Sequence, residues 1–174
     1  MPDSLKILFT HADIEQVIQR LARSIRQDFG QEEIVFVCVL KGSFIFTADL
    51  VRAVANPSVV DFIRISSYRN GMTHGNVAIT KDLETDIQGK NVVIVEDIID
   101  SGITLTSLRN MLLTRKPKAL KICALIDKRA RREVQIEGDY VGFSIDKGFV
   151  VGYGIDYAEK YRNLRDIFVV EEGE

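Results

Sequence analysis

Short, unbroken apolar runs constrain the fold of this chain more than any other feature of its sequence. The run IVFVCVL shows no alternation between apolar and polar residues, which is typical of a strand buried on both faces of a sheet. Strands are expected at 34–40, 59–65, 92–96 and 120–126. Apolar residues at helical spacing follow at 48–55 and 105–112. Alternating strands and helices predict an α/β fold with a mostly parallel sheet flanked by helices.

The length of 174 residues predicts one domain covering the whole chain. Its core is expected over roughly 34–138. Ahead of the core, apolar residues at helical spacing, a capping pair at Thr10 and Asp13, and a terminal Gly30 predict an amphipathic helix. The last third has short strand-like pieces and few helix signals. We therefore expect a small C-terminal hood over roughly 139–174, which the N-terminal segment could join.

Composition argues against several classes of protein. The formal charge is −2, so no global positive field attracts nucleic acid or a membrane surface. The start of the chain does not have the pattern of a signal peptide, and no run of about 18 apolar residues is present. Cys38 and Cys123 each lie within an apolar run, which predicts buried free thiols and a cytoplasmic location. His11 and His74 have no partners at metal-ligand spacing, so a zinc site is not expected.

A polar insertion from Ser66 to Lys90 interrupts the alternation of strands and helices. It contains Asn70-Gly71 and Gly75-Asn76, which are typical of turns, and has no clear period. A long polar insertion between buried strands is either a disordered surface loop or a lid over an active site. The residues of the insertion alone favour neither.

The most informative stretch follows the buried run at 92–96. The strand ends in the adjacent carboxylates Glu96 and Asp97, and the sequence DSGIT at 100–104 comes directly before a helix. In an open α/β sheet, ligands bind beyond the carboxyl ends of strands, where this loop must lie. Gly102 allows a close turn, and the first N–H groups of the helix form a phosphate-binding site. Carboxylates beside such a site fit a sugar phosphate with bound Mg²⁺, because they accept from ribose hydroxyls or hold the cation.

Taken singly, these residues have simpler explanations. Asp100 and Ser101 are also typical helix caps, and Glu96 with Asp97 could be a solvated strand end. The combined pattern is more specific: four apolar residues, Glu-Asp, two apolar residues and Asp-Ser-Gly-x-Thr. The sequence contains neither the Walker pattern nor G-x-G-x-x-G, which disfavours sites for nucleoside triphosphates and dinucleotides.

The combined pattern closely resembles the motif with which type I phosphoribosyltransferases bind phosphoribosyl pyrophosphate (PRPP). Motifs of their hypoxanthine-guanine branch follow in the expected order: Leu40-Lys41-Gly42, Ser67-Tyr68, Asp127-Lys128, and FVVGYGIDY (149–157) with Arg162. The resemblance covers roughly 34–165. It implies a type I phosphoribosyltransferase fold with a small C-terminal hood and a mobile lid loop. It also implies a purine salvage enzyme that transfers the 5-phosphoribosyl group from PRPP to N9 of hypoxanthine or guanine, giving IMP or GMP and pyrophosphate.

The resemblance also implies roles for the residues around the Glu-Asp pair. Those expected to bind PRPP and its 5′-phosphate are Glu96, Asp97, Asp100, Ser101, Gly102, Ile103 and Thr104. Glu96 and Asp97 would face the ribose hydroxyls and the Mg²⁺ cofactor. Asp100 would be the catalytic general base that removes the proton from N7 of the purine. Such assistance is commonly worth about 10²–10⁴ in rate.

Further roles implied by the resemblance concern pyrophosphate and the purine. The residues expected at pyrophosphate are Lys41, Gly42, Ser67, Tyr68 and Arg162. Lys128 would donate to O6 of the purine, Phe149 would stack on the base, and the backbone of Val150 would read its edge. Asp156 would help to hold a second Mg²⁺. Without the resemblance, Lys128 and Arg162 would be ordinary surface charges and Phe149 a core residue.

The resemblance bears on three larger features as well. Water must be kept from PRPP during transfer, which favours the lid interpretation of 66–90. The peptide between Leu40 and Lys41 can be cis in this family. Members associate as dimers or tetramers, so a homo-oligomer is expected, while neither nucleic acid nor membrane is an expected partner.

Three alternatives stay open on the sequence. The first is a phosphoribosyltransferase for another base, such as xanthine or a pyrimidine. The second is a nucleotide-sensing, RNA-binding regulator built on the same fold, for which the basic residues Arg129, Arg131 and Arg132 are the only local support; a solvated turn also explains them. The third is a receiver-like module phosphorylated on Asp97 or Asp100.

Overall fold

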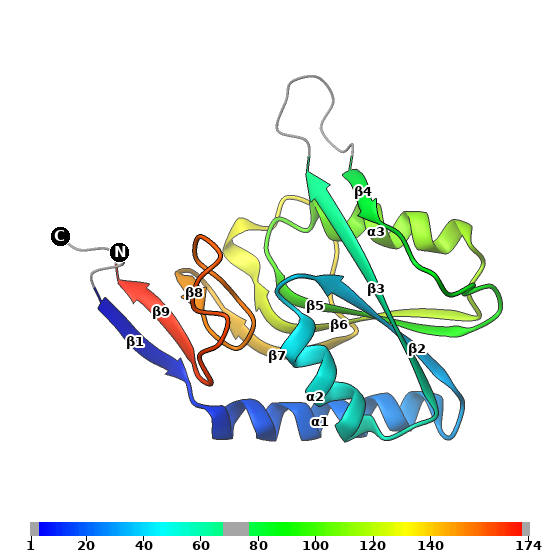
Figure 1. Ribbon diagram of the computed structural model, residues 1–174, viewed down its shortest axis with the longest axis horizontal. Helices are drawn as coiled ribbons and strands as arrows, with labels where there is room; N and C mark the ends of the chain where they lie inside the picture. The colour runs from blue at the N-terminus through cyan, green and yellow to red at the C-terminus, as the bar shows by residue number, and fades with distance from the viewer. Residues whose placement is uncertain (1–3, 68–76, 172–174) are drawn as a thin grey trace.

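The computed structural model describes residues 4–67 and 77–171, which form two β-sheets and three α-helices. In chain order the elements are β1 (Ser4–Phe9), α1 (His11–Phe29), β2 (Ile34–Leu40), α2 (Phe44–Val54), β3 (Ser58–Ser67), β4 (Val77–Lys81), β5 (Asn91–Ile99), α3 (Ile103–Thr114), β6 (Ala119–Lys128), the 3₁₀ turn η1 (Arg129–Arg131), β7 (Tyr140–Ile145), β8 (Phe149–Val151) and β9 (Ile167–Glu171). The smaller sheet lies beyond one end of the larger one (Figure 1).

The larger sheet has the strand order β4-β3-β2-β5-β6-β7. Strands β3, β2, β5, β6 and β7 run parallel to their neighbours, and β4 pairs antiparallel with β3. The predicted α/β class with a mostly parallel sheet is therefore confirmed. Helix α2 connects β2 with β3, and helix α3 connects β5 with β6, as is usual for the long crossovers between parallel strands.

Burial on both faces explains why the central strands read as unbroken apolar runs. Successive side chains of a strand point to opposite faces. In β2, Val35 and Val37 join the core beneath α3, whereas Phe36 packs into the core beneath α1 and α2. The helices thus cover the two faces of the large sheet, with α1 and α2 on one side and α3 on the other (Figure 1).

Helix α1 begins at the predicted capping pair. The side chain of Thr10 accepts a hydrogen bond from the backbone of Asp13, whose carboxylate accepts from the N–H of Thr10 at 2.9 Å. Gly30 ends the helix with a positive φ of 59°. From the exposed face of α1, Arg20 Nη2 donates to the carbonyl oxygen of Gly142 at 2.7 Å and so ties the helix to β7. The helix predicted from apolar spacing is confirmed.

The smaller sheet has the order β1-β9-β8, so the N-terminal strand pairs with the C-terminal one. The sequence had suggested only that the N-terminal segment could join the hood, without indicating a strand there. The large sheet also extends further than the core boundary near 138 suggested, because Tyr140–Ile145 pairs with β6. Residues 140–145 therefore belong to the core rather than to the hood.

The described part of the polar insertion is ordered by pairing. Strand β4 pairs with the end of β3, and Asp61, only 5% exposed, accepts from the N–H groups of Glu84 at 2.8 Å and Thr85 at 2.7 Å. Over 77–90 the chain is thus a strand and a hydrogen-bonded turn, not the irregular loop that its polarity suggested. The remainder of the predicted lid, including Tyr68, lies outside the described residues.

Within 4–67 and 77–171, no helix combines the length and the apolar character needed to span a bilayer. The longest, α1, has a polar face along its whole length, since only one side of it packs against the sheet and α2. The apolar stripe of α1 is therefore explained by the core of the large sheet.

Substitution of Gly142 by alanine should destabilise the fold. An added Cβ at this position would overlap the carbonyl oxygen of Leu125 and lie 3.0 Å from Cγ1 of Val17, so β7, β6 and α1 could not keep their spacing. We expect the free energy of unfolding, measured by urea titration, to fall by about 1–3 kcal/mol. The control is Ser144→Ala on the same strand, where the exposed side chain should change stability by at most about 0.5 kcal/mol. Equal stabilities for the two variants would contradict this packing argument.

Candidate active site

Three of the motifs singled out in the sequence meet at one edge of the large sheet. Strand β5 pairs in parallel with β2 on one side and with β6 on the other. Their carboxyl ends therefore lie next to one another and continue into the turns at 41–43, 100–102 and 129–131. This is the edge of an open α/β sheet at which ligands bind.

The loop between β5 and α3 has the geometry of an anion site. Gly102, with φ of 83°, occupies the left-handed region and immediately precedes the first turn of α3. Gly102 has no side chain with which to cap the helix. Within the described residues, the only side-chain acceptor for the first N–H groups of α3 is Ser101 Oγ, which lies 3.4 Å from the nitrogen of Ile103. The helix start is thus available to a negatively charged group.

The two carboxylates at the end of β5 lie partly buried. Glu96 Oε1 accepts from the N–H of Asp97 at 3.3 Å, and Asp97 Oδ1 accepts from the N–H of Ile98 at 2.9 Å. Burial, together with the negative charge of Asp97, raises the pKa of Glu96 well above its usual range. A cation bound by these two carboxylates would offset their mutual repulsion, which contributes to the raised pKa of Glu96.

The donor set fits magnesium bound together with a substrate. Within the described residues, no group of three or more His, Cys, Asp or Glu side chains converges as a closed metal site. Mg²⁺ typically binds through one or two carboxylates and completes its shell with water and substrate phosphate oxygens. Glu96 and Asp97 supply two such carboxylates beside the anion site.

The turn after β2 approaches β5 closely. A Cβ added at Gly42 would overlap the carboxylate of Asp97, and a Cβ at Gly154 would overlap the carbonyl oxygen of Gly42. Gly42 therefore lies between Asp97 and the hood, and neither Gly42 nor Gly154 has room for a side chain. The Leu40–Lys41 peptide that leads into this turn is cis.

Lys41 and Arg162, both predicted at pyrophosphate, lie in one cluster of charges. Glu159 Oε2 is 2.8 Å from Nζ of Lys41 and 3.3 Å from Nη2 of Arg162, while Asp156 Oδ1 is 2.9 Å from Arg162 Nη2. Hydrogen bonds from Lys41 and Arg162 lower the pKa of Glu159. Asp156 also accepts from the N–H of Glu159 at 2.8 Å, so both oxygens of the predicted metal ligand have partners here. The cluster joins the hood to the core.

Asp100, the predicted general base, has one occupied and one open carboxylate oxygen. Oδ2 lies 3.4 Å from Nη1 of Arg131. Oδ1 is buried and has no hydrogen-bond donor within the described part of the chain. A buried acceptor without a donor is uncommon, and a ligand N–H would satisfy it.

The residues predicted to read the purine occupy contrasting environments. Lys128 is only 8% exposed, and its ammonium has no hydrogen bond or ion pair among residues 4–67 and 77–171. Phe149 is 49% exposed and meets the ring of Tyr157 edge to face, with centroids 5.4 Å apart. Val150 is buried, but its backbone belongs to β8, an edge strand of the small sheet. An exposed ring and a free strand edge can both receive a planar base.

Two participants in the site escaped the sequence analysis. Glu159 pairs with a residue 118 positions away, for which no local pattern gives a signal. Arg132 was interpreted as part of a solvated turn, which is wrong: its side chain is 16% exposed, against 67% for Arg129 and 71% for Arg131. The pairing of Arg132 with the buried Asp127 accounts for this burial.

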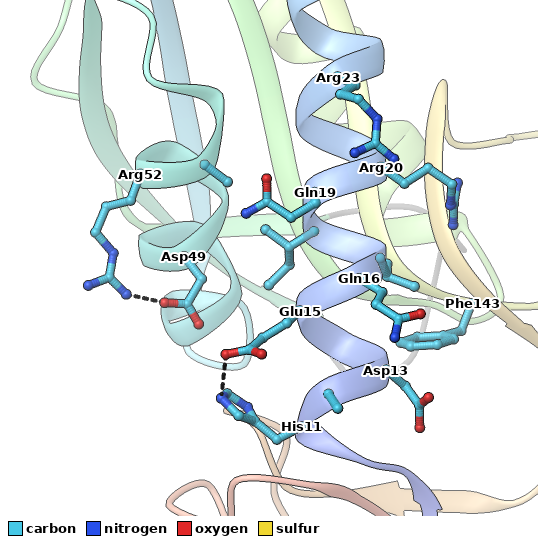
Figure 2. A pocket seen from close by; sticks show the side chains of 14 residues that line it. His11, Asp13, Glu15, Gln16, Gln19, Arg20, Arg23, Asp49, Arg52 and Phe143 are labelled. Atoms are coloured by element: carbon cyan, nitrogen blue, oxygen red, sulfur yellow. Dashed lines mark hydrogen bonds and ion pairs between the residues drawn. The ribbon is translucent and has the colours of Figure 1, made fainter.

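A separate surface groove of about 1200 Å³ lies along α1, α2 and Phe143 of β7 (Figure 2). None of the described residues predicted for the site lines it. Some of its polar side chains already pair with one another: His11 Nε2 lies 3.2 Å from Glu15, and Arg52 pairs with Asp49. We therefore assign the chemistry to the strand ends and not to this groove.

Comparison with known proteins identifies the family to which the chain belongs. Residues 4–158 match the family model described as phosphoribosyl transferase domain. The chain is 45% identical over 170 residues to the hypoxanthine-guanine phosphoribosyltransferase of Aquifex aeolicus, covering 97% of this chain and 96% of that protein. It is 50% identical over 167 residues to the hypoxanthine phosphoribosyltransferase of Salmonella typhimurium, covering 94% of each.

The likeness extends to solved structures. A crystal structure of a hypoxanthine-guanine phosphoribosyltransferase from Bacillus anthracis, with a HEPES molecule in its active site, matches with a TM-score of 0.93 and 50% identity. The match covers 97% of this chain and 100% of that one. With sequence and fold shared over nearly their whole length with these relatives, the chain belongs to the phosphoribosyltransferase family.

Proposed function

We propose that this chain transfers the 5-phosphoribosyl group of PRPP to N9 of hypoxanthine or guanine, giving IMP or GMP and pyrophosphate in purine salvage. The observation that carries the proposal is the position of Lys128, a buried lysine without a partner among the described residues. Lys128 is the last residue of β6, and β6 pairs with β5, the strand that leads into the phosphate loop. A reader for a 6-oxopurine and a site for a sugar phosphate thus occupy neighbouring strand ends.

Purine selectivity follows from the chemistry of Lys128. An ammonium has donors only, so it pairs with O6 of hypoxanthine or guanine but leaves the 6-amino group of adenine facing another donor. A buried polar site rejects a partner that leaves its groups unpaired, which makes the discrimination large. Phe149 stacks on the base, and the free edge of β8 at Val150 contacts the rim of the ring.

PRPP binds with its 5′-phosphate against the loop at 100–104 and the start of α3. The hydroxyls of Ser101 and Thr104 and the loop N–H groups are its donors, and Glu96 and Asp97 face the ribose hydroxyls. Mg²⁺ would be held by Glu96 and Asp97, with a second ion at Asp156, and its charge would stabilise the departing pyrophosphate. Lys41 and Arg162 then exchange Glu159 and Asp156 for pyrophosphate oxygens.

The reaction follows from the development of charge at C1′. As pyrophosphate leaves, Lys41 and Arg162 hold its negative charge while the sugar gains oxocarbenium character. N9 of the purine attacks C1′, and Asp100 takes the proton from N7. The open Oδ1 of Asp100 supports this role, because it is a buried acceptor without a donor. The proposal also assigns Ser67 and Tyr68 to pyrophosphate and gives the predicted lid the task of keeping water from PRPP.

We also propose a cytoplasmic homo-oligomer, a dimer or a tetramer. Cys38 and Cys123 are free and buried, which fits a reducing compartment. Val60 and Phe62, which point to the same face of β3, are 41% and 39% exposed, an apolar surface that a second copy would cover. Neither nucleic acid nor membrane is part of the proposal.

The proposed reaction is tested by an ultraviolet assay with PRPP, Mg²⁺ and one base at a time: hypoxanthine, guanine, xanthine, adenine or uracil. We expect turnover of hypoxanthine or guanine and its loss on addition of EDTA. Turnover of xanthine or uracil alone would instead identify an enzyme for another base. Folded protein that turns over no base would favour the regulatory alternative and contradict the proposal.

Replacing the general base should affect turnover far more than binding. We expect Asp100→Asn to lower kcat by about 10²–10⁴, because asparagine cannot accept the proton from N7. The exposed Asp86→Asn is the control and should leave kcat unchanged. Near-normal turnover by a folded Asp100→Asn protein would remove the catalytic role of this residue.

Loss of a pyrophosphate contact should appear in the KM for PRPP. Arg162→Ala removes a cation whose side chain is 18% exposed, and we expect the KM to rise about tenfold, the equivalent of losing roughly 1.4 kcal/mol. Arg165→Ala removes an exposed arginine three positions away and should leave the KM unchanged. The same KM in both variants would rule out the proposed contact.

A further inference from the structure

Arg132 makes an unusual set of contacts behind the phosphate loop. Its Nε donates to the carbonyl oxygen of Asp100 at 3.0 Å, and its Nη2 lies 3.5 Å from the carbonyl oxygen of Ile99. The next residue continues the pattern, since the N–H of Glu133 donates to the carbonyl oxygen of Ser101 at 2.9 Å. Three consecutive carbonyl groups, of the last residue of β5 and the first two residues of the loop, are thus bound by two adjacent residues.

These bonds determine where the loop N–H groups point. In a trans peptide the N–H points opposite to the C=O of the same plane. Holding the carbonyls of Asp100 and Ser101 against Arg132 and Glu133 therefore turns the N–H groups of Ser101 and Gly102 the other way. Neither N–H has a hydrogen-bond acceptor in the parts of the chain that the structure describes. Two adjacent free N–H groups on one side of a turn form an anion-binding concavity.

The carbon stem of Arg132 also supports the left-handed turn. A Cβ added at Gly102 would lie 3.2 Å from Cδ of Arg132 and 2.5 Å from Cγ2 of Ile136. The loop therefore rests directly on this side chain. Nη1 of Arg132 donates to the carbonyl oxygen of Ile136, which fixes the guanidinium within its own segment.

The other end of the guanidinium is bound to the purine side of the site. Nη2 of Arg132 pairs with the carboxylate of Asp127, whose side chain is only 2% exposed. Asp127 immediately precedes Lys128 on β6. One side chain thus connects the loop that would bind the 5′-phosphate with the strand end that would read the base.

We propose that Arg132 is a positioning residue, which orients the N–H groups of the phosphate loop and holds that loop against β6 at Asp127. The proposal rests on the proposed function. Arginine suits the task because its planar guanidinium carries five N–H donors in fixed directions, whereas the ammonium of lysine is a compact charge that cannot span the same acceptors.

The chain supplies a matched control for the charge of Arg132. Arg129 also binds Asp127, with its Nε 2.9 Å from Oδ2, but is 67% exposed and has no contact with a loop carbonyl in the described residues. A comparison of Arg132→Lys with Arg129→Lys therefore separates support of the loop from pairing with Asp127.

The test measures the affinities of purified protein for IMP, for inosine and for pyrophosphate with Mg²⁺, by calorimetry. For Arg132→Lys we expect the Kd of IMP and the KM for PRPP to rise about 10- to 100-fold, the size of effect that small misplacement of a binding group produces. The Kd of inosine and that of pyrophosphate should stay unchanged, because neither uses the 5′-phosphate site. Arg129→Lys should match the wild type throughout. Arg132→Gln, which keeps hydrogen-bond donors without the charge, repeats the test should Arg132→Lys not fold.

The outcomes separate the two proposals. If the wild type binds neither IMP nor pyrophosphate and turns over no base, the proposed function fails. If the wild type binds IMP and the folded Arg132 variants bind it equally well, the positioning role is wrong and the proposed function stands. If the variants lose affinity for IMP, inosine and pyrophosphate alike, together with thermal stability, Arg132 has a general structural role, which also overturns the positioning proposal.

Discussion

The register between β5 and β6 is the constraint on which the rest of the site depends. Ile99 pairs with Asp127, so the first residue of the phosphate loop and the buried lysine follow at the same level of the sheet. A shift by one residue would turn every side chain of β6 to the opposite face. Both faces of these strands are buried against helices, so such a shift would exchange the side chains that fill the two core clusters and disturb their close packing. The packing of the core therefore fixes the spacing between Lys128 and the loop at 100–102.

Several charged side chains around the site have partners before any ligand arrives. Lys41 pairs with Glu159, Arg162 with Asp156, and Arg131 with Asp100. These pairs are partly or largely exposed, and such pairs contribute little to stability, so an incoming anion replaces a weak partner at small cost. Lys128 differs, because it is buried and has no partner in the described part of the chain. Under the proposed function, Lys41 and Arg162 would exchange their carboxylate partners for phosphate groups, whereas Lys128 would gain its partner from the purine.

Local patterns predicted most of the fold, because the forces that produce it act over few residues. The Thr10–Asp13 pair caps a helix within one turn, and the run at 34–40 records burial on both faces directly in its composition. What the sequence could not indicate arises from contacts between distant segments. The burial of Arg132 depends on the loop after β5, and the position of Glu159 depends on Lys41. Both look like surface charges in sequence, since nothing in their neighbourhood along the chain differs from a solvated turn.

The pairing of β1 with β9 has a consequence for the order in which the molecule can assemble. In the small sheet, β9 lies between β1 and β8, so neither outer strand has its neighbour until residues 167–171 have left the ribosome. The strands of the large sheet all precede this point in the chain and can pair during synthesis. Contacts between segments so far apart also form slowly, because closing a long loop costs entropy before it is rewarded. Strand β1, although it is synthesised first, is thus among the last strands to pair.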